Sequence, residues 1–87
     1  MQNNTAQAIT LIRARDIRRM TGLAVPTIYK HVSSGLLPGW VKIGSRASAW
    51  IKGEIDAVIK ARAEGRSNDE IKALVASLMA SRKGVEV

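Results

Sequence analysis

Residues 14–35 constrain the fold more than any other stretch, because they predict two short helices joined by a tight turn. The first helix spans Ala14–Thr21 and the second Pro26–Ser34, with Gly22 in the turn and Gly35 just past the second helix. Glycine readily adopts the left-handed backbone that such positions require, and proline suits the first position of a helix. Apolar residues recur one helical turn apart, so the helices can face one another across a small core: Ile17 and Met20, then Ile28 and Val32. This pattern is typical of a helix-turn-helix.

The second helix carries a polar face opposite its apolar stripe. At about 100° per residue, Lys30 points away from the direction that Ile28 and Val32 define. This side of the helix combines a cation, hydroxyls and one aromatic residue: Lys30, Thr27, Ser33 and Tyr29. The mixture suits phosphate and base-edge contacts in a DNA major groove. An ordinary solvated helix face has a similar composition, so the helix taken alone leaves both interpretations open.

Charge is distributed unevenly along the chain. Lys and Arg number 14 against 7 acidic residues, a formal net charge of +7. Residues 1–50 hold seven basic residues and one acid, a net of +6, whereas residues 51–87 hold seven and six, a net of +1. A one-sided excess of this kind indicates a nucleic-acid binder. In the first helix Arg15, Arg18 and Arg19 leave the core side, and each is either a phosphate contact or a solvated residue.

The segment after the helix-turn-helix predicts a β-hairpin. Trp40–Ile43 and Arg46–Trp50 alternate around Gly44-Ser45, an order that suits a two-residue type II′ turn. A hairpin at this point would be a wing, with Lys42, Ser45 and Arg46 at its tip, where cations reach phosphates or the minor groove. We expect Trp50 in the core. Upstream, Ile9–Ile12 predicts a short extended segment, and residues 1–8 predict a disordered arm.

Two further helices are expected. The first covers Lys52–Ala63 and ends at Gly65. Ser67 and Glu70 then form a capping box that begins a fourth helix, which continues to about Ser81. Its apolar stripe has regular helical spacing: Ile71, Leu74, Val75, Leu78 and Met79. The stripe either packs within the domain or forms an interface with a partner or a second copy. We expect a DNA-binding domain over 9–65 that closes without this helix, a separate amphipathic helix over 66–82, and a tail over 83–87.

Several short motifs together resemble the AlpA-type phage regulators and the related excisionases. The matching residues are Thr27-Ile28-Tyr29, Gly35-Leu36-Leu37-Pro38, Gly44-Ser45-Arg46 and Trp50, and the resemblance covers about residues 11–63. It implies a MerR-like winged helix-turn-helix, mainly α with a small hairpin. It also implies DNA binding, with Thr27, Tyr29 and Lys30 on the recognition helix and Arg46 on the wing. Ala24 departs from the serine usual before the second helix, and the fourth helix lies outside the resemblance.

We therefore expect a sequence-specific double-stranded DNA-binding protein, either a transcription regulator or a recombination directionality factor of a phage or mobile element. The predicted contacts are Arg15, Arg18, Arg19, Thr27, Tyr29, Lys30, Ser33, Lys42, Ser45 and Arg46. Expected partners are DNA, a second copy on DNA, and an integrase or the transcription machinery, in the bacterial cytoplasm at the nucleoid and not at a membrane. The alternative is a small adaptor that docks through its fourth helix.

The residue types present argue against an enzyme or a metalloprotein. The chain holds one His and no Cys, and no pair of carboxylates is placed for acid–base work. Its glycines lie at turns and helix ends instead of forming a nucleotide-binding pattern. We expect no catalytic residue, cofactor or metal. RNA is a weaker candidate ligand than duplex DNA, because the three aromatic residues offer few stacking surfaces for single strands.

Overall fold

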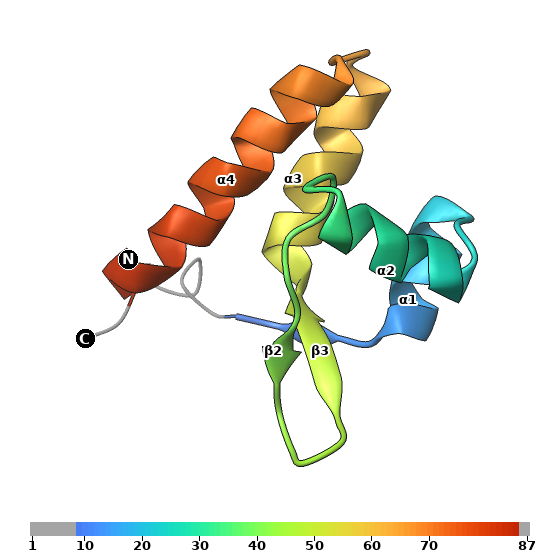
Figure 1. Ribbon diagram of the computed structural model, residues 1–87, viewed down its shortest axis with the longest axis vertical. Coiled ribbons are helices and arrows are strands. Elements are labelled where there is room, and N and C mark those ends of the chain that lie inside the picture. Colours follow the sequence, from blue (N-terminus) through green and yellow to red (C-terminus); the bar gives the residue numbers. More distant parts are fainter. Residues whose placement is uncertain (1–8, 86–87) are drawn as a thin grey trace, which may run out of the picture.

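The computed structural model describes residues 9–85, which form four helices and a small antiparallel sheet. The helices are α1 (Ala14–Thr21), α2 (Val25–Ser33), α3 (Lys52–Ala63) and α4 (Asn68–Val85), and the strands are β1 (Leu11–Ile12), β2 (Val41–Lys42) and β3 (Ser48–Ile51). The β2–β3 hairpin extends from one end of the molecule, while α3 and α4 meet in a turn at the opposite end (Figure 1). The predicted arm over 1–8 lies outside the described residues. Residues 83–85, predicted as tail, continue α4.

The helix-turn-helix pair forms largely as its sequence predicts. Gly22 and Gly35 have φ angles of +78° and +80°, the left-handed conformation expected at both helix ends. The bounds of α1 are confirmed, while α2 begins one residue early, at Val25, and places Pro26 second in the helix. That position also lacks an intrahelical partner for its N–H, so proline costs nothing there. In the turn, the Thr21 hydroxyl donates to the Ile17 carbonyl (2.8 Å) and accepts from the Leu23 N–H (3.1 Å).

The hairpin loop is longer than the predicted two-residue turn. Lys42 pairs with Ser48, and the Ile43 N–H donates to the Ala47 carbonyl at 2.9 Å, which leaves residues 44–46 to cross between the strands. Gly44 does not adopt the positive φ that a type II′ turn needs at its first central residue. The prediction of that turn type is therefore wrong. Ser45 and Arg46 do lie in the loop, but Lys42 lies in β2 and not at the tip.

The extended segment before α1 adds a third strand to the hairpin. β1 pairs antiparallel with β3, with Leu11 opposite Ile51 and Ile12 opposite Trp50, so the strand order is β1-β3-β2. A hydrogen bond from the Lys52 N–H to the Thr10 carbonyl (2.8 Å) continues this pairing. The middle strand, β3, thus links the start of α1 to the hairpin, a connection that matters for the site.

The core runs through all four helices of the described chain and the sheet. Trp50 is fully buried, as expected, and its indole N–H donates to the Pro38 carbonyl at 3.0 Å. The rest of the core cluster is aliphatic and comes from every helix, from β1 and from the loop after α2: Ile12, Ile17, Ile28, Leu37, Ile55, Val58, Ala61, Ile71 and Val75. No helix within residues 9–85 combines the length and apolar character needed to cross a bilayer.

The fourth helix contributes to this core, which favours packing within the domain over the partner interface that the sequence also left open. Ile71 is fully buried and Val75 is 6% exposed, so neither side chain is available to a partner in this arrangement. Leu74, Leu78 and Met79 also pack against the same core. The stripe packs within the chain because α4 folds back from the turn after α3 and packs against α3 (Figure 1).

The predicted capping box at the start of α4 is confirmed. The Glu70 N–H donates to the Ser67 hydroxyl (3.1 Å), and the Ser67 N–H donates to the Glu70 carboxylate (2.9 Å). This backbone hydrogen bond, with help from the nearby Arg66 charge, lowers the pKa of Glu70. Gly65, at φ +83°, ends the α3 segment before it.

Candidate nucleic-acid interface

A polar hollow of about 270 Å³ lies where the start of α1, the middle of α2 and the hairpin meet. Its lining combines three arginines with a tyrosine and two small residues: Arg13, Arg15, Arg46, Tyr29, Ala14 and Ser48. The β1–β3 register explains why residues far apart in sequence converge here. Ile12 is opposite Trp50, so the chain after Ile12 runs back toward Ser48, and the hairpin loop brings Arg46 beside it. The first turn of α1 and the hairpin loop thus share one surface.

The hollow is strongly electropositive. Arginine stays charged at any physiological pH and presents a planar set of donors that matches phosphate oxygens. None of Arg13, Arg15 and Arg46 makes an ion pair with another residue of the described part. One acid lies nearby: the Asp16 carboxylate accepts from the Arg13 backbone N–H (2.9 Å) at the start of α1. Three guanidinium groups against this single carboxylate leave the surface suited to an anion.

Tyr29 is held in place by aromatic packing. Its ring lies edge-to-face against Trp40, with centroids 5.3 Å apart, and against Trp50 at 5.6 Å. Such pairs contribute about 0.5–1.5 kcal/mol beyond the area they bury. Tyr29 and Trp40 remain 39% and 40% exposed, whereas Trp50 is fully buried. The buried indole therefore fixes a partly exposed aromatic surface that borders the arginine hollow.

The polar face of α2 continues from the hollow. Lys30 and Ser33 are exposed and Thr27 is half-buried, in line with the helical spacing. The Ser33 hydroxyl donates to the Tyr29 carbonyl at 3.2 Å, which ties it to its own helix. His31 lies on a different side of α2, in an apolar pocket shared with Val58 and Ile59 of α3. The exposed side of α2 thus presents Lys30 and Ser33 next to Tyr29.

The remaining predicted contacts lie outside the hollow. Lys42 and Ser45 are exposed on the hairpin, and Arg18 is exposed on α1. Arg19 is exposed too, but it forms an ion pair with Asp16 at 3.5 Å, which reduces its availability to a ligand. Within the described residues, no three side chains among His, Asp and Glu come together as a metal site.

Sequence reasoning missed two residues of this surface. From the sequence, Arg13 counts only toward the positive charge of residues 1–50, and Ser48 only lies in the second predicted strand of the hairpin. The feature that brings both residues to this surface is the antiparallel pairing of β1 with β3, which places residues 13 and 14 beside the start of β3. A two-residue strand is too short for its partner to be recognised from the sequence pattern alone.

The fold and this surface together define a small helix-turn-helix-like domain with a basic face. Residues 10–63 match the family described as prophage CP4-57 regulatory protein (AlpA), and this stretch covers more than half of the chain. The chain belongs to that family of phage regulatory proteins, as its motifs predict. The match spans β1 to the end of α3 and leaves α4 outside it. Neither the curated proteins nor the solved structures compared with the chain include a match.

Proposed function

We propose that this protein is a sequence-specific double-stranded DNA-binding regulator with a winged helix-turn-helix. In this proposal α2 enters the major groove and the β2–β3 hairpin is the wing, which follows the adjacent backbone. The protein then acts at the nucleoid in the bacterial cytoplasm. The observation that carries the proposal is the arginine hollow, which unites α1, α2 and the hairpin around a site for an anion.

The hollow fits a DNA phosphate better than a small metabolite. It is an open, polar depression on the surface instead of an enclosed pocket, and arginines from two separate elements border it. Contacts of this kind position a protein on a duplex without reading its sequence. Arg13, Arg15 and Arg46 would take this role, while Lys42 and Ser45 would contact the backbone farther along the hairpin.

Sequence reading is assigned to the exposed side of α2. Lys30 can donate to the O6 and N7 atoms of guanine, and Thr27 and Ser33 can exchange hydrogen bonds with base edges. Tyr29 lies between this helix face and the hollow, where a hydroxyl suits a phosphate contact. Arg18 and Arg19 are assigned outer backbone contacts, with Arg19 the weaker because of its pairing with Asp16.

Two regulatory roles fit this interface equally well. The protein acts either on a promoter, with the transcription machinery, or at an attachment site, where it directs an integrase as an excisionase does. A footprint on DNA flanking the gene in its native context distinguishes them. Protection of a promoter supports a transcription regulator, protection of an attachment site supports a directionality factor, and no protection of either contradicts both roles.

The adaptor alternative finds little support in the geometry. It requires the apolar stripe of α4 to face a partner, but Ile71 and Val75 lie within the chain's own core. Self-association through the same stripe would require α4 to leave α3 first. We therefore assign α4 a role within the domain.

A further inference from the structure

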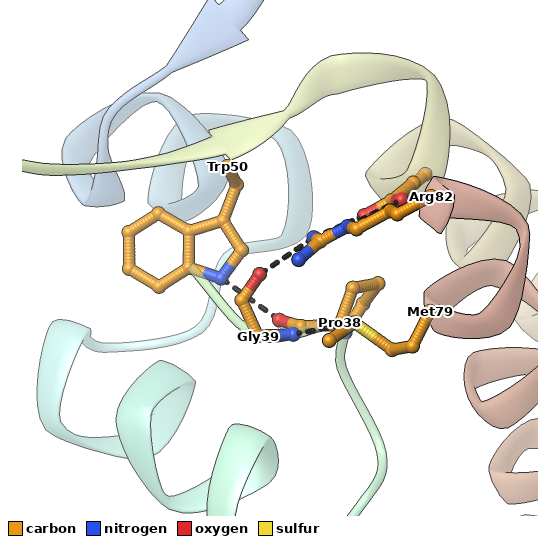
Figure 2. Close-up of polar contacts among 6 residues, drawn as sticks. Pro38, Gly39, Trp50, Met79 and Arg82 are labelled. Atoms are coloured by element: carbon orange, nitrogen blue, oxygen red, sulfur yellow. Dashed lines mark hydrogen bonds and ion pairs between the residues drawn. The ribbon is translucent and has the colours of Figure 1, made fainter. Parts of the chain in front are cut away.

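The two residues before Trp40 are held by three side chains from two elements, β3 and α4. The Trp50 indole donates to the Pro38 carbonyl (3.0 Å), the Gly39 N–H donates to the Met79 sulfur (3.3 Å), and Arg82 donates to the Gly39 carbonyl (2.7 Å). Figure 2 shows Pro38 and Gly39 between the indole on one side and the two α4 side chains on the other. Pro38 itself is fully buried. A loop that connects α2 to the hairpin is thus fixed by the fourth helix.

Arg82 is itself oriented by a buried acid. Its guanidinium donates to both oxygens of the Glu54 carboxylate, at 2.9 and 2.5 Å, in the bidentate geometry specific to arginine. Glu54, in the first turn of α3, is 8% exposed and is the buried charged residue of the described core. Because one Arg82 nitrogen bonds both Glu54 and Gly39, the ion pair also sets the position of the Gly39 carbonyl.

The fastened loop leads directly to the candidate DNA surface. Trp40 follows Gly39 in the chain, and its ring packs against Tyr29 of α2 and against Trp50, with centroids 5.3 and 6.0 Å apart. Tyr29 in turn lines the arginine hollow. A continuous series of contacts therefore joins Arg82, Gly39, Trp40, Tyr29 and the hollow.

We propose that Arg82 is a positioning residue for DNA binding. By holding the Gly39 carbonyl, it keeps Trp40 against Tyr29 and so sets the position of α2 relative to the hairpin. The C-terminal helix lies outside the family match, which covers residues 10–63. In this proposal it is nevertheless needed to hold α2 and the hairpin in the arrangement that binds DNA. This inference rests on the proposed function and adds a residue that never touches the DNA.

The alternative is that Arg82 only stabilises the fold by neutralising Glu54. Removing one partner of a buried ion pair leaves an uncompensated charge, which lowers stability whether or not any site is affected. The two roles differ in what happens to a molecule that is still folded. A positioning role requires folded variants to bind DNA more weakly and to show an altered aromatic environment.

The test uses the full chain and compares four variants with the unchanged protein. Arg82→Gln removes the guanidinium, and Arg82→Lys keeps the charge but not the bidentate geometry, which also provides a milder variant should the first fail to fold. Arg66→Gln removes the same charge from an arginine that is 55% exposed and pairs only with Glu64 and Glu70 among the described residues. Val58→Ala lowers stability from the α3 side of the core and leaves in place the side chains that hydrogen-bond Pro38 and Gly39.

Two properties are measured at a temperature where each variant is folded. One is the dissociation constant for a duplex carrying the footprinted site, at fixed salt. The other is the near-ultraviolet circular dichroism of the cluster formed by Tyr29, Trp40 and Trp50. The comparison is informative only if the unchanged protein binds with salt-dependent affinity, and absence of that binding refutes the proposed function itself.

The expected result is that both Arg82 variants weaken DNA binding by about tenfold, within the range for residues that act through packed neighbours. Both should alter the aromatic circular dichroism, Arg82→Lys less than Arg82→Gln. Arg66→Gln and Val58→Ala should retain affinity within about twofold and keep the spectrum, although Val58→Ala melts earlier. If the folded Arg82 variants keep the dissociation constant and the near-ultraviolet circular dichroism that Val58→Ala shows, Arg82 only stabilises the fold and the inference is overturned.

Discussion

The basic face and the α3–α4 pair contain similar numbers of cations but use them differently. In the described residues, Asp16 and Arg19 form the ion pair of the N-terminal half. The C-terminal half matches its cations with acids: Lys52 with Asp56, Lys60 with Glu64, Arg66 with Glu64 and Glu70, and Arg82 with Glu54. The hollow, by contrast, gathers three arginines that pair with none of the acids described.

This difference determines which side of the molecule keeps a net positive charge. Most ion pairs of the C-terminal half are solvent-exposed, and such pairs typically contribute about 0–1 kcal/mol. Their main effect is to cancel the electrostatic field on that side. The net charge of the molecule is therefore concentrated on the face formed by α1, α2 and the hairpin, as expected for a protein that approaches a polyanion from one side.

The largest expected effect concerns the core that supports both regions. Ile71 is fully buried in the core that α4 shares with α3, so Ile71→Ala should destabilise the protein by about 2–5 kcal/mol. Ser77→Ala, on the exposed side of α4, should change stability by less than about 0.5 kcal/mol. Urea unfolding followed by circular dichroism measures both. Equal midpoints for the two variants would mean that α4 is not part of the core.

The same burial reverses the expectation for a truncated chain. A chain that ends at residue 66 was expected to remain folded, but it would expose the apolar side of α3 that Ile71 and Val75 cover. We now expect that chain to be largely unfolded.

The second prediction tests whether the arginines of the hollow contribute more to DNA binding than cations on the α3–α4 side. The combined variant Arg13→Ala, Arg15→Ala and Arg46→Ala should change the slope of log K against log salt from about −4.5 to about −2, because three fewer counterions are released. The control removes the same charge from the other side, with Lys52→Ala, Lys60→Ala and Arg66→Ala, and should keep a slope of about −4.5. Fluorescence anisotropy with labelled duplex at several salt concentrations measures each slope. Equal losses in both combined variants would show that net charge matters and the hollow does not.

The third prediction sharpens the division between reading and positioning. Lys30→Ala should lose discrimination between the footprinted site and random duplex, since a good base-edge contact provides about 1–3 kcal/mol of discrimination. Arg46→Ala should weaken binding to both duplexes by a similar factor, as expected for a phosphate contact. Dissociation constants on both duplexes at one salt concentration are compared. A specificity ratio that survives Lys30→Ala and is lost in Arg46→Ala would make the hairpin the reading element.

The smallest effect is a pH dependence confined to the α4 side. The pKa of Glu70 is lowered from 4.5 because its carboxylate accepts the Ser67 N–H. The folded state therefore gains stability from this group above its ordinary pKa and loses it as the pH falls through the lowered value. Glu70→Gln should show a shallower loss of melting temperature between neutral and acidic pH than the unchanged protein. If the melting temperatures of Glu70→Gln and the unchanged protein fell by the same amount between neutral and acidic pH, the assignment would be contradicted.

Local sequence signals predict much of this fold because the helix ends are chemically marked. Gly22, Gly35 and Gly65 end helices in the left-handed conformation, and Ser67 with Glu70 begins one. The apolar spacing in turn predicts which side of each helix is buried. These local signals do not indicate which distant segments pair, because that pairing depends on tertiary contacts.

Three features were missed or misjudged for that reason. The partner of β1 is β3, and this pairing brings Arg13 and Ser48 into the hollow. The loop closed by Ile43 and Ala47 depends on strand register and not on the Gly-Ser sequence alone. The stripe of α4 has the same spacing whether it faces α3 or a partner, so only the tertiary arrangement distinguishes the two.

The most direct test of the central claim is a salt titration of duplex binding by the unchanged protein. If Arg13, Arg15, Arg18, Lys42 and Arg46 meet phosphates, about five contacts give a slope of log K against log salt of roughly −4 to −5. Anisotropy measured between 50 and 200 mM salt, a range over which such a slope is readily resolved, provides the value. A slope in that range supports the basic face as a DNA-binding surface. A slope near zero would contradict it and remove DNA binding as the function of this protein.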